Sequence, residues 1–197
     1  MKPYSEACEQ NRQPILEVLE DYLIKPTRLL EIGSGSGQHG VYFASALPNL
    51  RWQLSDLQSN LGGIELWFEE AALPNLLGPL ELDVRGPWPE NQYDAIFSAN
   101  TVHIMSWKAI SAMFSAMPSV LTRDGLVLIY GPFNYNGEYT SESNARFDDW
   151  LKQRSPDSRI RHFEDVNELA GQAKLELICD HGMPANNRLL VWRNTGP

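Results

Sequence analysis

Short apolar runs alternate, over the first two thirds of the chain, with longer segments whose apolar residues recur every three or four positions. The first pattern is typical of buried strands and the second of amphipathic helices. The predicted strands are Arg28–Ile32, Arg51–Ser55, Leu80–Val84, Asp94–Ser98 and Leu126–Tyr130. The predicted helices are Asn11–Ile24, Gln38–Leu47, Asn60–Ala72 and Trp107–Met117. Because strands that alternate with helices form βαβ units, we expect a mostly parallel sheet covered by helices.

The pattern changes after Tyr130. The polar segment Gly131–Asn144 is typical of a functional loop. The elements predicted beyond it are two helices, Ala145–Arg154 and Glu164–Ala173, and two strands, Leu175–Cys179 and Arg188–Trp192. Because no helix separates these strands, we expect them to pair as an antiparallel hairpin. The sequence therefore predicts an α/β fold with a doubly wound, Rossmann-like, mostly parallel sheet of seven strands that ends in this hairpin.

A glycine-rich turn follows the first predicted strand. Glu31 lies at the end of that strand, and Gly33, Gly35 and Gly37 follow at alternate positions. Glycine permits backbone conformations that are closed to other residues and lets a ligand approach the main chain closely. Counted from Gly35, the turn fits the dinucleotide pattern G-x-G-x-x-G, which ends at Gly40. A carboxylate at the strand end repels phosphate, however, so the turn suits a neutral or cationic nucleoside better than a pyrophosphate.

Counted from Glu31, the same turn has the form acid-x-G-x-G-x-G and resembles motif I of the class I S-adenosylmethionine-dependent methyltransferases. A seven-stranded sheet with a C-terminal hairpin is also similar to the fold of that family and unlike the six-stranded dehydrogenase fold. The resemblance implies that S-adenosylmethionine binds at the carboxyl ends of the strands, where the strand order reverses. The residues that it implies in cofactor binding are Glu31, Gly33, Ser34, Gly35, Gly37, His39, Asp56, Leu57, Asp83, Val84 and Asn100.

Three acidic residues of this set lie near the ends of consecutive predicted strands. Asp56 follows the second strand and corresponds to the family residue that accepts both ribose hydroxyls; alternatively, it caps the next helix. Asp83, in the third strand, corresponds to the residue that binds the adenine amino group, with the next backbone N–H meeting a ring nitrogen. One such Asp is more often a cap or turn residue, so the cofactor prediction depends on Glu31, Asp56 and Asp83 together.

Five further segments carry a narrower resemblance. They are Asn11–Leu16, Phe97–Ile104, Tyr130–Phe133, Ser141–Asp148 and Met183–Asn187. They are similar to sequences of a family of small methyltransferase-like proteins named as a domain of unknown function, and the resemblance covers nearly the whole chain. We expect a single methyltransferase domain over residues 1–197. Within it, residues 1–26 would form a helical cap, 27–131 the cofactor-binding half and 132–197 the substrate side.

The acceptor site is expected beyond the fourth and fifth strands and at the hairpin. Methyl transfer from a sulfonium is an in-line displacement, and a base is needed only where the acceptor must lose a proton. His103 is the candidate base, because imidazole titrates near neutral pH; alternatively, it binds the cofactor or caps the next helix. The predicted acceptor-binding residues are Arg12, Tyr130, Phe133, Asn144, Met183, Asn186 and Asn187. Arg12 alternatively only caps its helix, and the Asn186–Asn187 pair only turns the hairpin.

Two features limit the class of acceptor. The segment Asn100–His103 lacks the Asn-Pro-Pro-Tyr/Phe sequence by which many DNA-base and glutamine methyltransferases hold a planar amino group. The net charge is −9, from 16 Lys and Arg against 25 Asp and Glu, and no basic run is present. Because phosphate neutralisation supplies most of the non-specific affinity for nucleic acid, this composition disfavours nucleic acid as a substrate. We therefore expect a small-molecule acceptor.

Further expectations concern location and metals. No apolar run approaches the roughly 20 residues that cross a bilayer, and Met1–Glu6 lacks the apolar core of a signal peptide. Cys8 and Cys179 lie at opposite ends of the chain, and neither they nor the histidines have metal-ligand spacing. We therefore expect a cytoplasmic monomer or homodimer with free thiols that binds neither a metal nor a membrane.

Three functions remain open at this point. The leading hypothesis is an enzyme that transfers the methyl group of S-adenosylmethionine to a small molecule and releases S-adenosylhomocysteine. The pattern Gly35–Gly40 keeps a nicotinamide-dependent oxidoreductase as the alternative. A third hypothesis is a non-catalytic protein that retains the cofactor fold as a scaffold.

Overall fold

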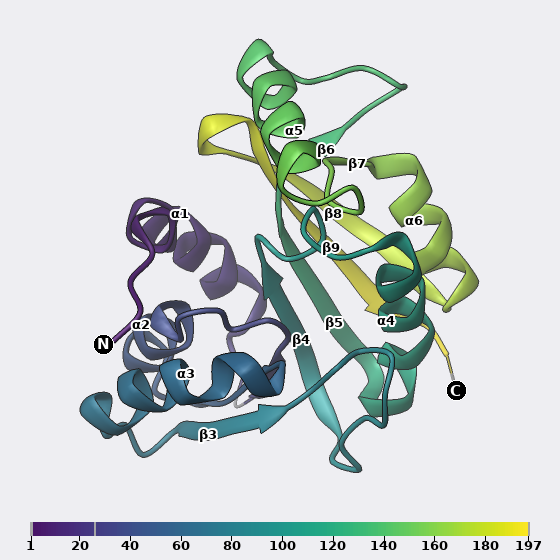
Figure 1. Cartoon of the computed structure of the whole chain (residues 1–197). Helices are drawn as coiled ribbons and strands as arrows, with labels where there is room; N and C mark the ends of the chain where they lie inside the picture. The colour runs from purple at the N-terminus through teal and green to yellow at the C-terminus, as the bar shows by residue number, and fades with distance from the viewer. Residues whose placement is uncertain (1, 26, 197) are drawn as a thin grey trace.

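The computed structural model describes residues 2–25 and 27–196. Its main sheet has seven strands in the order β3-β2-β1-β4-β5-β9-β8, and β9 runs antiparallel to both of its neighbours (Figure 1). The strands are β1 (Thr27–Glu31), β2 (Leu50–Asp56), β3 (Leu76–Glu81), β4 (Tyr93–Ala99), β5 (Leu121–Gly131), β8 (Leu175–Met183) and β9 (Asn187–Asn194). The remaining pairings are parallel. This confirms the predicted doubly wound α/β sheet with its C-terminal antiparallel hairpin.

Helices cover both faces of this sheet (Figure 1). Three of them, α1, α2 and α3, lie on one face, and α4 and α6 lie on the other, while α5 lies beyond the carboxyl ends of the strands. Their bounds are α1 (Glu6–Tyr22), α2 (Gln38–Ala46), α3 (Gln58–Ala71), α4 (Trp107–Val120), α5 (Glu142–Arg154) and α6 (Phe163–Gln172). The ends of β1 and β4, where the strand order reverses, are therefore left between the two layers of helices.

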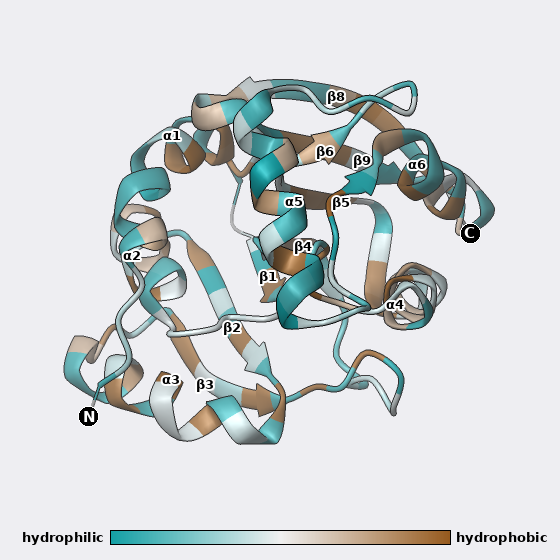
Figure 2. Cartoon of the chain, turned by 45° about the horizontal axis from the view of Figure 1, so that its top comes forward, coloured by the Kyte–Doolittle hydropathy of each residue, from teal (hydrophilic) through white to brown (hydrophobic). Residues whose placement is uncertain are grey.

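The central strands bury both of their faces. In β1, Leu29 packs into the core under α1–α3, whereas Leu30 packs into the core under α4 and α6. Phe97 and Ile96 of β4 divide in the same way. A strand that is covered on both sides is apolar at nearly every position, which is why these segments are continuous apolar runs. Figure 2 shows hydrophobic residues along these inner strands, with helices around them.

The first helix begins earlier than predicted. We expected it at Asn11, whereas α1 begins at Glu6, because the hydroxyl of Ser5 accepts a hydrogen bond from the backbone N–H of Cys8 and caps the helix. The sequence prediction started only at the first periodic apolar residues and missed this polar first turn. The difference matters for function, because the added turn reaches the carboxyl edge of the sheet.

The third strand also differs from the prediction. We expected Leu80–Val84, whereas β3 runs from Leu76 to Glu81, so that Asp83 and Val84 lie in the turn after the strand. Gly78 and Pro79 precede the predicted strand but lie inside β3. This strand pairs only with β2 and forms the edge of the sheet. An edge strand tolerates a proline, because one of its sides needs no N–H donors.

The segment after β5 is more ordered than predicted. Within the expected loop Gly131–Asn144 lies the short strand β6 (Phe133–Asn134), which pairs with β7 (Arg161–His162) in a separate two-stranded sheet. The helix α5 begins at Glu142 instead of Ala145, because the Ser141 hydroxyl accepts from the Asn144 N–H at 3.1 Å. The hairpin strands likewise extend beyond their predicted ends, which leaves only Pro184–Asn186 as the connection.

Candidate cofactor and acceptor site

A cavity of about 860 Å³ lies at the carboxyl ends of β1 to β4. Its walls come from the glycine-rich turn, the segments after β2, β3 and β4, the beginning of α1, and α5 together with the residues that follow it. Open α/β sheets bind their ligands at this place, outside the strand ends where the strand order reverses. The volume lies toward the upper end of the roughly 300–1,000 Å³ that small-molecule sites occupy.

Left-handed glycines shape the turn after β1. Gly33, Gly35 and Gly37 have φ values of +73°, +60° and +88°. The N–H groups of Gly33 and Ser34 both donate to the carbonyl of Ser55, at 3.0 and 2.9 Å, which holds the turn against β2. A Cβ on Gly33 would lie 2.8 Å from the side chain of Thr101, whereas a Cβ on Gly35 would meet no atom within 4 Å. Gly35 therefore presents bare backbone to the cavity.

Asp56 ties this turn to the start of α3. Its Oδ2 accepts from the Gly35 N–H at 2.7 Å, and its Oδ1 accepts from the Leu57 N–H at 2.7 Å and from Asn60 Nδ2 at 2.8 Å. The residue is buried, yet it lines the cavity together with Leu57 and Asn60. A carboxylate has about four acceptor sites, so these donors leave it room for a ligand hydroxyl. The sequence had not pointed to Asn60.

Glu31 and Gly37 lie outside the cavity lining. The carboxylate of Glu31 lies behind the turn, where Trp52 Nε1 donates to it at 2.9 Å. Burial raises the pKa of this carboxyl group to about 7, and the Trp52 hydrogen bond only partly opposes that shift. A Cβ on Gly40 would come within 2.9 Å of the same carboxylate. In this structure, Glu31 therefore supports the packing of α2 under the turn.

The segment after β3 contains an ion pair that the sequence had not suggested. Arg85 donates to both oxygens of the Asp83 carboxylate, at 2.9 and 2.6 Å, and both residues line the cavity. The hydrogen bonds from Arg85 lower the pKa of Asp83 to about 2. The predicted adenine-binding carboxylate is thus already paired, while Val84 lies between these two residues in the lining.

Two buried histidines face the cavity from opposite walls. Nε2 of His39, in the first turn of α2, lies 2.7 Å from Oδ1 of Asn11, and its ring stacks on Phe43. His103, in the loop after β4, makes no side-chain hydrogen bond to any residue in 2–25 or 27–196, and Phe147 of α5 meets its ring edge-on at 5.4 Å. Burial lowers the pKa of each imidazole to about 4, with smaller contributions from nearby arginines. Both rings are therefore neutral at pH 7.

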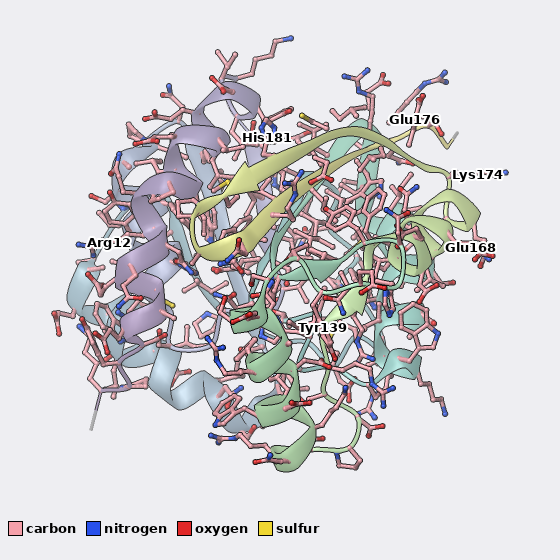
Figure 3. All side chains as sticks on the ribbon, turned by 90° about the horizontal axis from the view of Figure 1, so that it is seen from above. Arg12, Tyr139, Glu168, Lys174, Glu176 and His181 are labelled. Carbon is pink, nitrogen blue, oxygen red and sulfur yellow. The ribbon has the colours of Figure 1, made fainter. Side chains whose placement is uncertain are left out.

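Residues of α1 and α5 that the sequence prediction had not assigned to the site complete the walls. From the first turn of α1, Ser5, Ala7 and Cys8 line the cavity on the side of His39. From α5, Phe147 and Trp150 line it on the side of His103. Figure 3, a view onto the strand ends, shows α1 and α5 as separate walls, with Arg12 on α1. A polar first turn and two aromatic residues at helical spacing were the signals available in the sequence.

The residues predicted to bind the acceptor lie outside this lining. Arg12 forms an ion pair with Glu9 at 2.6 Å and covers the ring of Tyr42. Tyr130 and Phe133 are buried among core residues. None of these three residues lines the cavity.

The remaining acceptor candidates belong to the hairpin and its contact with α5. Asn144 Nδ2 donates to the carbonyl of Asn186 at 3.2 Å, which joins α5 to the hairpin connection. Asn186 itself has a φ of +58°, and Asn187 Nδ2 donates back to the carbonyl of Pro184. Met183 ends β8 beside this connection. The Asn pair thus turns the hairpin, which was the alternative reading of these residues.

No helix in the described part of the chain is long and apolar enough to cross a bilayer. Among residues 2–25 and 27–196, no three His, Cys, Asp or Glu side chains gather as a potential metal site. Both cysteines, Cys8 and Cys179, are free thiols.

Over residues 2–194 the sequence matches the family described as "Protein of unknown function (DUF938)". The chain belongs to this family. The match covers almost all of the chain and confirms the predicted resemblance to a family of unknown function. Family membership by itself assigns no substrate.

Solved methyltransferase structures share this fold. An O-methyltransferase family protein from Burkholderia thailandensis superposes with a TM-score of 0.82 at 13% identity, over 93% of this chain and 56% of that chain. The S-adenosylmethionine-dependent methyltransferase SibL, in its apo form, gives 0.81 at 18% identity, over 96% and 56%. The pyocyanin biosynthetic protein PhzM gives 0.77 at 17%, over 91% and 54%. The chain thus spans about half the length of these proteins and has the class I methyltransferase fold that motif I implied.

Proposed function

We propose that this protein transfers the methyl group of S-adenosylmethionine to a small-molecule acceptor. The observation that carries the proposal is the composition of one cavity: bare glycine backbone and the Asp56 carboxylate on one side, and a neutral histidine with free ring nitrogens on another. The similarity to S-adenosylmethionine-dependent methyltransferases supports the same cofactor through the fold. A shared fold does not establish an activity, so the proposal depends on this site.

The lining residues fit that cofactor. The open space at Gly35 is a cradle that any Cβ would fill, and it adjoins the Asp56 carboxylate, which has room to accept a ribose hydroxyl. Leu57, which is 46% exposed, and the backbone of Val84 would enclose the adenine. When bound, S-adenosylmethionine supplies a methyl group on a positively charged sulfur. The task left to the protein is to align the acceptor with that methyl group and to exclude water.

In this proposal, His103 accepts the proton that an acceptor hydroxyl or amine loses. Its ring is neutral at pH 7, is held edge-on by Phe147, and makes no hydrogen bond to a described residue that would compete with the acceptor. His39 is less suited to this task, because Nε2 of its ring is already engaged with Asn11. We therefore assign the base to His103 and a cofactor-facing position to His39.

The nicotinamide alternative is less compatible with the start of α2. Dinucleotide sites bind the pyrophosphate at a free helix N-terminus. Here Ser5 and Glu9 of the α1 region cover that end, and Glu9 Oε1 accepts from Gln38 Nε2 at 2.9 Å. These contacts occupy the helix end at which a phosphate group would bind. We therefore place a sulfonium cofactor at this turn in preference to a dinucleotide.

Calorimetric titration separates these alternatives. We expect S-adenosylhomocysteine to bind with one-site stoichiometry and NAD to give no heat under the same conditions. NAD binding without S-adenosylhomocysteine binding would overturn the proposal. A protein that binds S-adenosylhomocysteine but transfers no methyl group to any compound of a broad acceptor panel would instead be a scaffold.

A substitution at Asp56 tests the placement of the ribose. We expect Asp56→Ala to weaken S-adenosylhomocysteine binding by about 1.5–3 kcal/mol for each charge-assisted hydrogen bond lost, which is roughly ten- to hundredfold in Kd. Because Asp56 also holds the N–H of Gly35, a simple loss of affinity does not separate the ribose contact from the shape of the turn.

A second ligand resolves that ambiguity. Removing the ribose hydroxyls from S-adenosylhomocysteine should weaken its binding to the wild-type protein and have little effect on binding to Asp56→Ala, because the two changes remove the same contact. Equal losses in both proteins would show that Asp56 only shapes the turn. The control variant Asn60→Ala removes one neighbour of the carboxylate and keeps the carboxylate itself.

A further inference from the structure

Three aromatic rings form a continuous stack along one wall of the cavity. Phe147 meets the His103 ring edge-on, with centroids 5.4 Å apart and an interplanar angle of 72°. Phe147 also stacks on Trp150, at 5.7 Å and 19°. Phe147 and Trp150 are three positions apart on α5, so they share one face of that helix. The stack therefore extends from the free imidazole outward along the wall, and all three rings line the cavity.

Two large apolar side chains in this part of the cavity are exposed to solvent. Trp150 is 47% exposed, and Ile104, which follows His103 in the same loop, is 58% exposed. The guanidinium of Arg154 packs over the Trp150 ring at 4.6 Å, which restrains the indole. Apolar surface that gathers in a cavity, where a ligand would bury it, marks a binding site more than scattered exposed residues do.

Charge at this site argues against an anionic acceptor. Among the described residues that line the cavity, Arg85 is the one Lys or Arg, and its guanidinium is already bound at two points by Asp83. Beside the stack the lining offers Ser106, Ser155 and Asp157. A carboxylate or phosphate on the acceptor would meet no unpaired cation among these lining side chains and would lie near the charge of Asp157, since the guanidinium of Arg154 is packed over the Trp150 ring and does not line the cavity.

We propose that this aromatic wall binds an uncharged, planar aromatic acceptor and presents a hydroxyl group on its ring to His103. The inference rests on the proposed methyltransferase function and names its substrate class. Ring–ring contacts favour offset-stacked and edge-on geometries, both of which the wall already contains between its own members. A flat ring that follows this stack brings its edge, and thus a hydroxyl on that edge, toward the imidazole.

The proposed methyl transfer is a single displacement at the methyl carbon. The hydroxyl oxygen forms a bond to the methyl carbon, and the bond between that carbon and the sulfonium sulfur breaks, with its electron pair left on the sulfur. The hydroxyl proton goes to a ring nitrogen of His103. The products are the aromatic methyl ether, S-adenosylhomocysteine and a protonated imidazole, which returns its proton to solvent. No further reactant is needed.

The test uses naphthol as the planar probe and decalol, its saturated counterpart, as the shape control. Both are titrated into protein saturated with S-adenosylhomocysteine, and both are offered as acceptors with radiolabelled S-adenosylmethionine. We expect naphthol to bind and to be methylated in preference to decalol. We expect Trp150→Ala to weaken naphthol binding roughly tenfold and to leave the affinity for S-adenosylhomocysteine unchanged. Phe147→Leu, which keeps an apolar side chain, should have an effect in the same direction.

A matched control is present in the chain. Trp107, at the start of α4, is 40% exposed and lines a separate hollow of about 320 Å³, not this cavity. Trp107→Ala should change neither affinity. Thermal unfolding of each variant verifies the fold, and because Trp150 is half-exposed, its removal opens no core cavity.

The results of these titrations distinguish a failure of the aromatic-wall inference from a failure of the proposed methyltransferase function. Equal binding of naphthol and decalol, or wild-type naphthol affinity in Trp150→Ala, would overturn the aromatic wall as the acceptor site. Loss of S-adenosylhomocysteine affinity in Trp150→Ala would assign the wall to the cofactor and also overturn the inference. A wild-type protein that binds S-adenosylhomocysteine but not naphthol contradicts this inference alone. A wild-type protein that does not bind S-adenosylhomocysteine contradicts the proposed function itself.

Discussion

Turnover of the His103→Asn variant should fall roughly 10²–10⁴-fold, while its affinity for S-adenosylhomocysteine stays at the wild-type value. Asparagine keeps a polar side chain in the loop after β4 but cannot take up the acceptor proton at neutral pH. The measurement combines initial rates on an acceptor that the wild type methylates with calorimetry on the variant. A large loss of cofactor affinity would show that His103 holds the cofactor and would remove its assignment as the base.

The pH profile provides an independent readout of the same residue. Burial, and then the nearby Arg161 guanidinium, lower the pKa of His103 from 6.5 to about 4. The imidazole is thus protonated only near and below pH 4, so kcat/KM of the wild type should rise as the pH increases through about 4 and then level off. The rising limb should be absent in His103→Asn. A limb that persists in the variant would assign it to another group.

Stability at low pH must be controlled in that experiment. His39 and His103 both have pKa values lowered to about 4 in the folded protein, against 6.5 for an unperturbed histidine. Between these values the two histidines bind more protons in the unfolded chain than in the folded one, so they lower the free energy of unfolding as the pH falls from 6.5 toward 4. The raised pKa of Glu31, about 7, opposes part of this loss. Thermal unfolding measured at each pH separates this loss from a loss of catalysis.

Gly35→Val should abolish the binding of S-adenosylhomocysteine. Gly35 has a φ of +60°, which a β-branched residue rarely adopts, and its missing Cβ faces open space in the cavity. A valine side chain would therefore occupy the volume proposed for the cofactor and would also strain the turn. Titration of the variant with S-adenosylhomocysteine checks the prediction.

Gly137 offers a matched control for that substitution. It also has a left-handed backbone, with a φ of +80°, and a Cβ there meets nothing within 4 Å, but it lies in the loop after β6 and does not line the cavity. Gly137→Val thus introduces comparable backbone strain, of about 1–2 kcal/mol, without filling the site. We expect both variants to lose similar stability and only Gly35→Val to lose binding. Wild-type affinity in Gly35→Val would contradict the placement of the cofactor.

Local patterns in the chain predicted several residues that line one side of this cavity. The strand-to-helix turn at Gly33–Gly37, the acidic end of β2 and the loop after β4 were each predicted from a short stretch of sequence. A parallel strand delivers the residues after it to the same edge of the sheet as its neighbours do. For this reason Gly35, Asp56 and His103 line one cavity, although they are far apart in the chain.

The opposite wall was not predictable in the same way. The sequence pattern favoured the polar loop after β5 and the hairpin as the acceptor site, because amide and aromatic residues are concentrated there. In the structure the hairpin strands extend to Met183 and Asn187, so the Asn residues turn the chain beside α5 instead of facing the cavity. The helical periodicity of α5 indicated a helix but not which neighbour its aromatic face would meet.

The sequence by itself determined the class of fold and the position of the glycine turn, because hydrophobic periodicity and the backbone freedom of glycine act over a few neighbouring residues. Only the tertiary structure decided which side chains enclose the cavity. It turned the Glu31 carboxylate behind the turn toward Trp52 and set Phe147 against His103. These contacts join separate segments of the chain, so the orientation of each side chain depends on how helices pack over the strand ends, which no local pattern specifies.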